Sequence, residues 1–411
     1  MNALISLGIA MAAGLAMTRP MKLIKLPNVT AFLFAGLLIG PSLWTLITGG
    51  RFCGILDADA LKAFDIIVTV ALGFIAFSIG GEFRFSDVKK LGKQIFIITI
   101  IQALGATIFV FGALMIFGFS LPEALALGAI ATATAPAATL LVVRQYKADG
   151  PVTRTLLPVV AFDDAIGLMI FSVFISLART IAEGGRATVK NMLIEPLAEI
   201  VLSLVIGALL GIIVALCGKW FKSRENRLSV CIAATVIGVG LVELFDAKKF
   251  TVLGVRLSLS SLLLCMMIGA VFCNLSKDYG KMLEGTDRWT PPLFMLFFVI
   301  SGAELDLALL PKIGVIGVVY IVFRSLGKYF GARLGATVAG ADKNVRKYLG
   351  ITLLPQAGVA IGMAQIVTSE LGTYGASIRA VVLCATLIYE IVGPVLTKIA
   401  LQKAGEIRKD L

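Results

Sequence analysis

The stretch 156-LLPVVAFDDAIGLMIF-171 contains two adjacent aspartates, Asp163 and Asp164, inside an apolar run. A single ionised carboxylate at the middle of a membrane costs at least ~2.5–3.5 kcal/mol on insertion scales. Two neighbouring carboxylates cost more, because the charge of each opposes the ionisation of the other. The pair therefore indicates a site for protons or cations, and a chance occurrence is the less favoured interpretation.

The composition of the whole chain agrees with a membrane environment. The 411 residues are 58% hydrophobic and only 15% charged, with a mean hydropathy of +0.97. A soluble protein of this length has no core large enough for so much apolar surface, so we predict a polytopic membrane protein. The net charge of +12 would suggest nucleic acid in a soluble protein, but here it favours basic cytoplasmic loops that face anionic lipid.

Cysteine and histidine usage narrows the chemistry further. The six cysteines lie mostly in apolar segments and show no metal-ligand spacing, so we expect neither a disulfide framework nor a bound metal cofactor. The chain has no histidine, and any pH response must come from other groups. The run Ile5–Met17 has no preceding positive residue, and we expect a first membrane helix there and not a cleaved signal peptide.

Apolar runs of spanning length predict about thirteen transmembrane helices. The expected spans are 2–18, 28–46, 63–81, 94–117, 121–143, 155–178, 193–217, 228–245, 254–274, 290–309, 312–338, 345–369 and 376–401.

Basic residues orient this map. A cytoplasmic C-terminus and an external N-terminus put most of the lysines and arginines on the cytoplasmic side, as the positive-inside rule requires. Two cations, Arg324 and Lys328, remain well inside the span 312–338. Intramembrane cations are expensive in the same way as the aspartates, so we treat them as candidate site residues.

Three pairs of motifs indicate an internal repeat. Gly-x-Glu-apolar recurs at Glu82 and Glu304, proline recurs at Pro136 and Pro355, and an acid followed three residues later by glycine recurs at Asp164 and Glu390, all about 220 residues apart. The first six spans would correspond to spans eight to thirteen. Because corresponding helices are seven spans apart, an odd number, they cross the membrane in opposite directions, and such inverted repeats are a transporter architecture. The fold class expected is therefore all-α, with two inverted repeats of six spans.

The two prolines predict broken helices at matching positions of the repeats. Proline removes a backbone donor and interrupts a helix. Two unwound segments that cross would expose carbonyls and helix ends near the middle of the membrane, where a cation or a buried charge can use them. Gln356, next to Pro355, is expected to bond this unwound backbone. Two ordinary kinked helices are the alternative.

Together these motifs resemble the monovalent cation/proton antiporter superfamily, and in particular its branch with an Asp-Asp pair, the electrogenic bacterial sodium/proton antiporters. The likeness covers essentially the whole chain, in family order. It is carried by residues 24–41 (IKLPNVTAFLFAGLLIGP), the Thr-x-Pro of residues 134–136, the Asp-Asp pair, the basic span and the Glu-x-x-Gly-Pro of residues 390–394.

The resemblance implies a homodimer in the inner membrane that serves pH homeostasis. It implies a mobile core of residues 88–178 and 312–401 on a dimerisation scaffold of residues 1–87 and 190–309. Asp164 would bind the cation and exchange it for protons, while Asp163 would pair with the basic residue of span 312–338. That position matches Arg324 best, with Lys328 as the alternative.

Two departures from the family pattern bear on the mechanism. Ala135 stands where the family usually has an acid between threonine and proline. The intramembrane cation of electrogenic members is typically lysine, and an arginine in that place cannot release a proton at working pH. Electrogenic exchange therefore depends on which cation faces the aspartates.

We expect one site that binds either a cation or protons and opens alternately to each side. Na⁺ (or Li⁺) at Asp164 would use hydroxyls of Thr132 and Thr134 and water, and Glu390 is a possible partner of Arg324 or Lys328. Potassium/proton exchange and sodium-coupled solute symport are the rival transport functions. A channel or a membrane scaffold has no motif in its favour, and no residue set indicates an enzyme or a cofactor.

Overall fold

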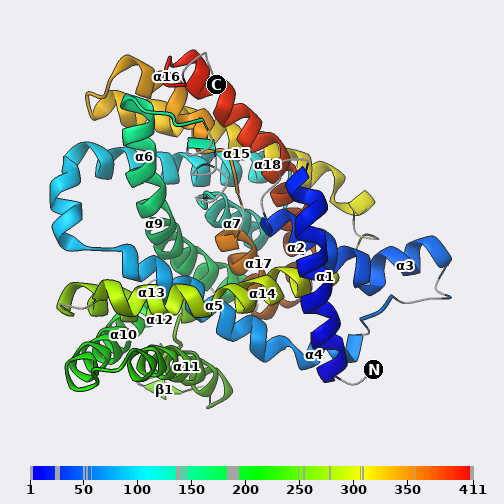
Figure 1. Ribbon diagram of the computed structural model, residues 1–411. Helices are drawn as coiled ribbons and strands as arrows, with labels where there is room; N and C mark the ends of the chain where they lie inside the picture. Colours follow the sequence, from blue (N-terminus) through cyan, green and yellow to red (C-terminus); the bar gives the residue numbers. More distant parts are fainter. Residues whose placement is uncertain are drawn as a thin grey trace. The chain divides into compact units, whose positions relative to one another are not determined.

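The computed structural model describes residues 3–23, 28–49, 51, 54–56, 58–135, 139, 142–143, 146–182, 194–248, 250–252, 255–276, 279–305, 307, 310–356 and 358–407 (Figure 1). The predicted all-α class is confirmed, with one two-residue ladder between β1 (Thr251–Val252) and β2 (Val255–Arg256). The helices are α1 (Ala3–Leu23), α2 (Asn28–Ile39), α3 (Pro41–Thr48), α4 (Ala58–Ala63), α5 (Asp65–Glu82), α6 (Phe85–Ile116), α7 (Leu121–Ile130), α9 (Pro151–Ala182), α10 (Glu195–Trp220), α11 (Arg224–Lys248), α12 (Ser261–Leu275), α13 (Tyr279–Trp289), α14 (Pro291–Ala303), α15 (Leu310–Val338), α16 (Lys343–Thr352), α17 (Gly358–Glu370), η3 (Gly372–Tyr374) and α18 (Gly375–Lys403).

Six helices of the described residues are long and apolar enough to cross a membrane by themselves, and one bent pair could add a seventh. The bent pair is α2 and α3, which meet at 49° where a single span over 28–46 was expected. Pro41 begins α3 and disfavours helical backbone at the preceding residue, so Gly40 is extended and the helix breaks there. Several other apolar helices are shorter than a full span, and the number of thirteen stays a prediction.

The chain divides into two compact units by its internal contacts. Unit 1 contains residues 1–64, 91–167 and 295–411, and unit 2 contains residues 65–90 and 168–294. Residues 1–64 group with the broken helices of unit 1, although the sequence assigns them to the scaffold. Packing describes which helices touch and not which helices move, so the division into core and scaffold stays a prediction.

Unit 2 is held together by helices that approach closely at glycines. A Cβ atom on Gly80 of α5 would lie 1.8 Å from the carbonyl oxygen of Met266 in α12, and one on Gly269 would lie 2.1 Å from that of Phe77. A Cβ atom on Gly207 of α10 would lie 2.5 Å from the carbonyl oxygen of Leu264 in α12. Small residues allow such contact between apolar helices, where dispersion replaces the hydrophobic effect as the driving force.

Unit 1 contains two interrupted helices. α7 begins with a capping box, in which Ser120 and Glu123 satisfy each other's backbone N–H groups, and ends at Ile130. Residues 131–135 follow without helical structure, and residues 353–356 separate α16 from α17 in the same way. The two unwound stretches are joined by a backbone hydrogen bond of 2.8 Å from Ala135 N to Pro355 O.

The helix that carries the aspartates, α9, is capped from the end of the chain. The Glu406 carboxylate is buried and accepts hydrogen bonds from Val152 N (2.6 Å), Thr153 N (2.8 Å) and Thr153 Oγ1 (2.7 Å). A carboxylate at a helix N-terminus satisfies the free N–H groups and complements the helix dipole. Gly150 makes room for it, because a Cβ atom there would lie 2.4 Å from the carboxyl carbon of Glu406.

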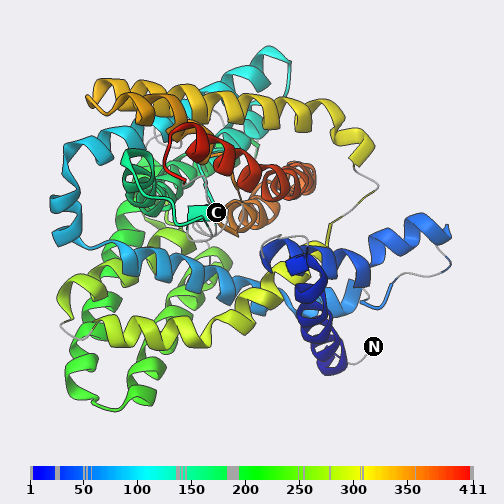
Figure 2. The same cartoon turned by 45° about the horizontal axis from the view of Figure 1, so that its top comes forward.

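Glycines also set the crossing of α6 and α15 in unit 1. Gly327, Gly331 and Gly335 recur every fourth residue along one face of α15 and meet α6 around Gly105. A Cβ atom on Gly327 would lie 2.8 Å from Ala106 Cα and from Gly105 O. Figure 2 shows α15 running beside α18, so α15 has neighbours on more than one side.

We expect Gly327→Val to destabilise the protein by about 1–3 kcal/mol, because the added carbons would push two backbones apart. Gly314→Val in the same helix is the matched control, since no atom lies within 4 Å of a Cβ atom at that position. Melting of the purified proteins in detergent measures the difference. Equal midpoints for the two variants would contradict the close crossing.

Candidate ion-binding site

Asp163 is completely buried in α9 and is held from three other segments of unit 1. Its Oδ1 atom accepts a hydrogen bond from Gln102 Nε2 of α6. Its Oδ2 atom accepts from Thr134 Oγ1 at 2.5 Å and from Lys328 Nζ of α15 at 2.7 Å. A buried carboxylate requires a compensating charge and satisfied lone pairs, and these contacts supply both.

The Lys328 ammonium is equally buried, and its three N–H groups are shared among four oxygens within hydrogen-bond distance. They belong to the carboxylate of Asp163 (2.7 Å), the amide of Gln102 (2.8 Å), the hydroxyl of Thr134 (2.9 Å) and the carbonyl of Thr132. The Thr132 carbonyl is available because residues 131–135 are not helical. The break after α7 thus provides two of the four oxygens around the positive charge.

Gln102 was not among the residues that the sequence singled out. Its amide bridges the ion pair, since Nε2 donates to Asp163 while Oε1 accepts from Lys328. The close α6–α15 crossing positions it, because a Cβ atom on Gly331 would lie only 3.0 Å from Gln102 Cα. The available signal was an amide well inside the apolar run 94–117, whose other glutamine, Gln94, stands at its first position, and such an inner residue needs a polar partner in a membrane.

Arg324 has a different role from Lys328. It is fully buried and donates to Ala131 O (3.2 Å), Ala133 O (2.6 Å) and Leu354 O (2.8 Å), the carbonyls exposed where α7 and α16 end. Its guanidinium also lies 4.4 Å from the ring centre of Tyr389. A fixed positive charge at two helix C-termini satisfies free carbonyls and offsets the negative ends of two helix dipoles.

These contacts correct the preferred assignment of the partner of Asp163. The sequence favoured Arg324, but the ion pair is made by Lys328, the alternative. The physical reason is that the unwound carbonyls compete for the guanidinium. Its planar set of donors matches several carbonyls at once, whereas the ammonium is a compact charge that suits one carboxylate and its neighbours.

The remaining polar groups tie the two breaks together. Gln356 Nε2 donates to Ile130 O at 3.1 Å and to the Tyr320 hydroxyl at 2.9 Å, so its amide bonds the end of α7. Thr134 Oγ1 lies 3.4 Å from Leu353 O. Pro355 packs against Gly393 of α18, where a Cβ atom would lie 2.8 Å from the proline ring. Pro136 lies outside the described residues.

The other predicted site residues are placed as follows. Asp164 belongs to α9, but its side chain lies outside the described part of the chain. The Thr132 hydroxyl donates to Ala129 O at 2.7 Å, and the Thr132 carbonyl accepts a hydrogen bond from Lys328. Glu390 is buried in α18 and accepts a hydrogen bond from Thr30 Oγ1 of α2 at 2.7 Å. The expected pairing of Glu390 with Arg324 or Lys328 is not among the ion pairs of the described residues.

The sequence model of the family described as "Sodium/hydrogen exchanger, transmembrane" matches residues 8–403 of this chain. The chain belongs to the sodium/hydrogen exchanger family. As a family member it is an integral membrane protein that belongs with the cation/proton transporters and not with enzymes. This outcome confirms the superfamily that the sequence motifs resemble, while the Asp-Asp branch within it stays a prediction.

Relatives and solved structures agree with the family. Na(+)/H(+) antiporter 1 of Methanocaldococcus jannaschii is 25% identical over 80% of this chain and 73% of its own length. The ammonium/H(+) antiporter subunit AmhT of Alkalihalophilus pseudofirmus is 22% identical over 85% and 83%. The structure of the sodium proton antiporter MjNhaP1 from M. jannaschii at pH 8 superposes with a TM-score of 0.76 at 19% identity, covering 98% of both chains. This exchanger therefore has the same fold.

For the ion pair we expect Lys328→Met to cost about 3–5 kcal/mol, because a buried carboxylate loses its charge partner. Adding Asp163→Asn should restore part of that loss, since the double variant buries no unpaired charge. In thermal melting in detergent at neutral pH, we expect the midpoint to be highest for the wild type, lower for the double variant and lowest for Lys328→Met. Lys343→Met, at an exposed lysine, is the control for loss of a charge. A double variant no more stable than Lys328→Met would contradict the coupling.

Proposed function

We propose that the chain exchanges sodium or lithium for protons by alternating access, with cation and protons competing for the paired aspartates. The observation that supports this most directly is the set of four oxygens around the Lys328 ammonium. Carboxylate, carbonyl, amide and hydroxyl oxygens are also the ligands that hard alkali cations use. A transported cation would therefore compete with the ammonium for the same groups.

Competition of this kind couples the two ions. When Asp163 and Asp164 are both ionised, one positive charge from Lys328 leaves one negative charge for a cation. Arrival of a sodium ion at Asp164 would add a second cation beside Lys328, and repulsion would weaken the hold of the ammonium on its proton or on Asp163. Return of protons to Asp164 and Lys328 reverses these changes and releases the cation.

The identity of the cation beside Asp163 bears on the charge moved in each cycle. Lysine can release its proton when it is desolvated near another positive charge, whereas arginine cannot. With Lys328 in this place, two protons can leave for each sodium ion that binds, one from Asp164 and one from Lys328. We therefore propose electrogenic exchange, with Arg324 as a permanent structural charge.

The crossed helix breaks support alternating access. Half-helices joined by unwound backbone move as rigid pieces around a fixed site, and Arg324 and Gln356 connect both breaks in this exchanger. Placement in the inner membrane with the C-terminus in the cytoplasm, a homodimer, and a role in pH homeostasis complete the proposal.

The decisive assay uses proteoliposomes with an internal pH dye and an imposed proton gradient. Sodium or lithium should dissipate the gradient, and Asp164→Asn and Asp163→Asn should each abolish that response. Glu243→Gln, at an exposed acid of α11, is the control expected to remain active. Potassium and ammonium are tested alongside. The apparent KM for sodium should rise as the pH falls, by more than about tenfold per pH unit and toward about 100-fold where each sodium ion must displace both protons. Full activity of both aspartate variants would refute the proposal.

Charge movement gives a second prediction. If one net charge crosses per sodium ion, a potential of 100 mV contributes ~2.3 kcal/mol and shifts the equilibrium sodium gradient by roughly 50-fold. Lys328→Arg keeps the positive charge but cannot release a proton, so its sodium gradient should no longer respond to a clamped potential. Arg324→Lys leaves the exchange protons in place and should keep the response. A voltage response in Lys328→Arg equal to wild type would exclude lysine as a proton donor.

A further inference from the structure

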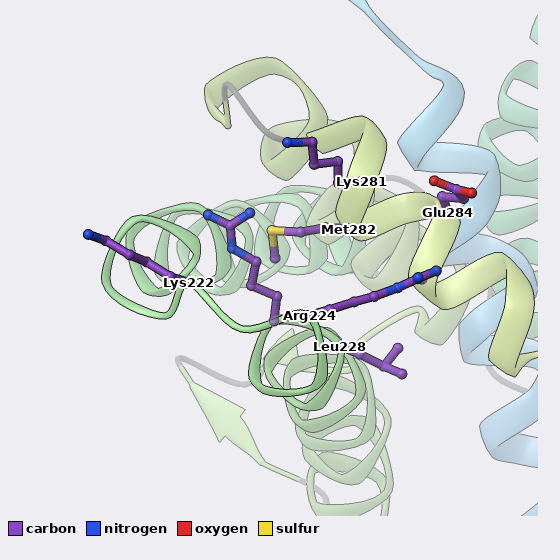
Figure 3. Close-up of a pocket in the computed structure, with 8 residues that line it drawn as sticks. Lys222, Arg224, Leu228, Lys281, Met282 and Glu284 are labelled. Atoms are coloured by element: carbon purple, nitrogen blue, oxygen red, sulfur yellow. The ribbon is translucent and has the colours of Figure 1, made fainter.

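A basic pocket of about 240 Å³ lies within unit 2, where α10 ends, α11 begins and α13 passes across them (Figure 3). Met282, which is buried, and Leu228 provide its apolar lining. Arg224, at the start of α11, points toward Met282, and Lys281 lines the pocket from α13. Lys222 lines it from the α10–α11 turn, with its ammonium pointing outward in Figure 3. The pocket is separate in sequence from every residue assigned to ion exchange.

The charges around this pocket are strongly unbalanced. Lys222, Arg224, Arg227 and Lys281 line it together with a single acid, Glu284. Glu284 already forms an ion pair with Arg288 one turn further along α13. The first turn of α11 adds the positive end of its helix dipole, since α11 begins at Arg224. The pocket therefore favours an anion.

α10 has an exposed apolar face that ends next to this basic pocket. Val205, Leu209, Ile213, Leu216 and Trp220 are spaced by three or four residues and are 50–85% exposed. This spacing puts them on one side of a helix long and apolar enough to span a membrane. Trp220, at the end of the stripe, is 85% exposed, and tryptophan prefers the level of lipid headgroups. Lys222 follows two residues later, where a headgroup would lie.

We propose that this pocket binds the phosphate-containing headgroup of an anionic phospholipid, with its acyl chains along the exposed face of α10. The cations of the pocket and the apolar stripe of α10 together identify the class of ligand. A soluble anion would use the cations but not the apolar stripe, and a neutral lipid would use the stripe but not the cations. With an external N-terminus, the predicted spans put residues 218–227 and 275–289, which contain the cations of the pocket, on the cytoplasmic side. The cytoplasmic leaflet carries anionic lipid.

The expected strength follows from the number of charges. Each lysine or arginine close to an anionic surface changes affinity by roughly fivefold. Removing three of the four cations should therefore weaken binding by roughly 100-fold. Arg227 is left in place because its Nε donates to Phe221 O at 2.7 Å and helps to shape the turn.

The test is a lipid titration of the purified full-length protein in detergent, followed by native mass spectrometry and by melting. Dioleoyl phosphatidylglycerol should bind and raise the melting midpoint, whereas dioleoyl phosphatidylcholine and glycerol phosphate without acyl chains should not. The variant Lys222→Gln, Arg224→Gln, Lys281→Gln should lose the effect. The control Lys343→Gln, Lys347→Gln, Lys403→Gln removes the same charge at other exposed lysines and should keep it.

Each opposite outcome overturns the proposal. Equal binding of the zwitterionic lipid would show that the cations do not select the headgroup, and equal protection by glycerol phosphate would show a site for soluble anions. Unchanged lipid binding by the triple variant would place the lipid elsewhere. A cross-link between copies through Leu216→Cys that phosphatidylglycerol does not reduce would assign the stripe to a second copy. None of these measurements requires cation exchange, so failure of the proposed transport function is distinguished from failure of this site.

Discussion

Lys328 and Asp163 are both completely buried, and neither is tolerable in that environment without the other. Removing an ion from water costs several kcal/mol, and an opposite charge compensates only when further hydrogen bonds satisfy both groups. Gln102 and Thr134 provide bonds to both partners, and the Thr132 carbonyl adds one more. The requirement of one ion pair therefore fixes α6, α9, α15 and the break after α7 at a common point.

The break after α7 is stable for a related reason. Unwound backbone in a membrane needs partners for its carbonyls, because no water is available to satisfy them. Arg324 supplies these partners to the ends of both α7 and α16, and Gln356 adds a bond to Ile130. Arg324 and Lys328 thus have different roles. The arginine holds the crossed helices, and the lysine stays with the carboxylate, where a change of protonation has consequences.

Close helix packing makes these contacts possible. Gly327, Gly331 and Gly335 lower the separation of α15 and α6 until the Gln102 amide reaches both charges. In unit 2, glycines also allow α5 to pack closely against α12. Helix α10 of the same unit has an exposed apolar face that ends at a basic pocket. Small residues where helices meet, and large apolar residues where they face lipid, are the two solutions that a membrane allows.

The sequence by itself determined the helical membrane class, the paired aspartates, the two intramembrane cations and, through the order of its motifs, the superfamily. The membrane class follows from the apolar composition, and the candidate site residues follow from the cost of a charge inside an apolar run, which is a local property. Tertiary structure decided which cation meets Asp163. Arg324 and Lys328 lie one turn apart on one face of α15, about 6 Å along its axis, so periodicity cannot separate them. Contacts from segments distant in sequence distinguish the two cations, since Arg324 bonds the carbonyl of Ala133 and Lys328 bonds Asp163. Tertiary contacts also place Gln102 beside the ion pair and Thr30 beside Glu390.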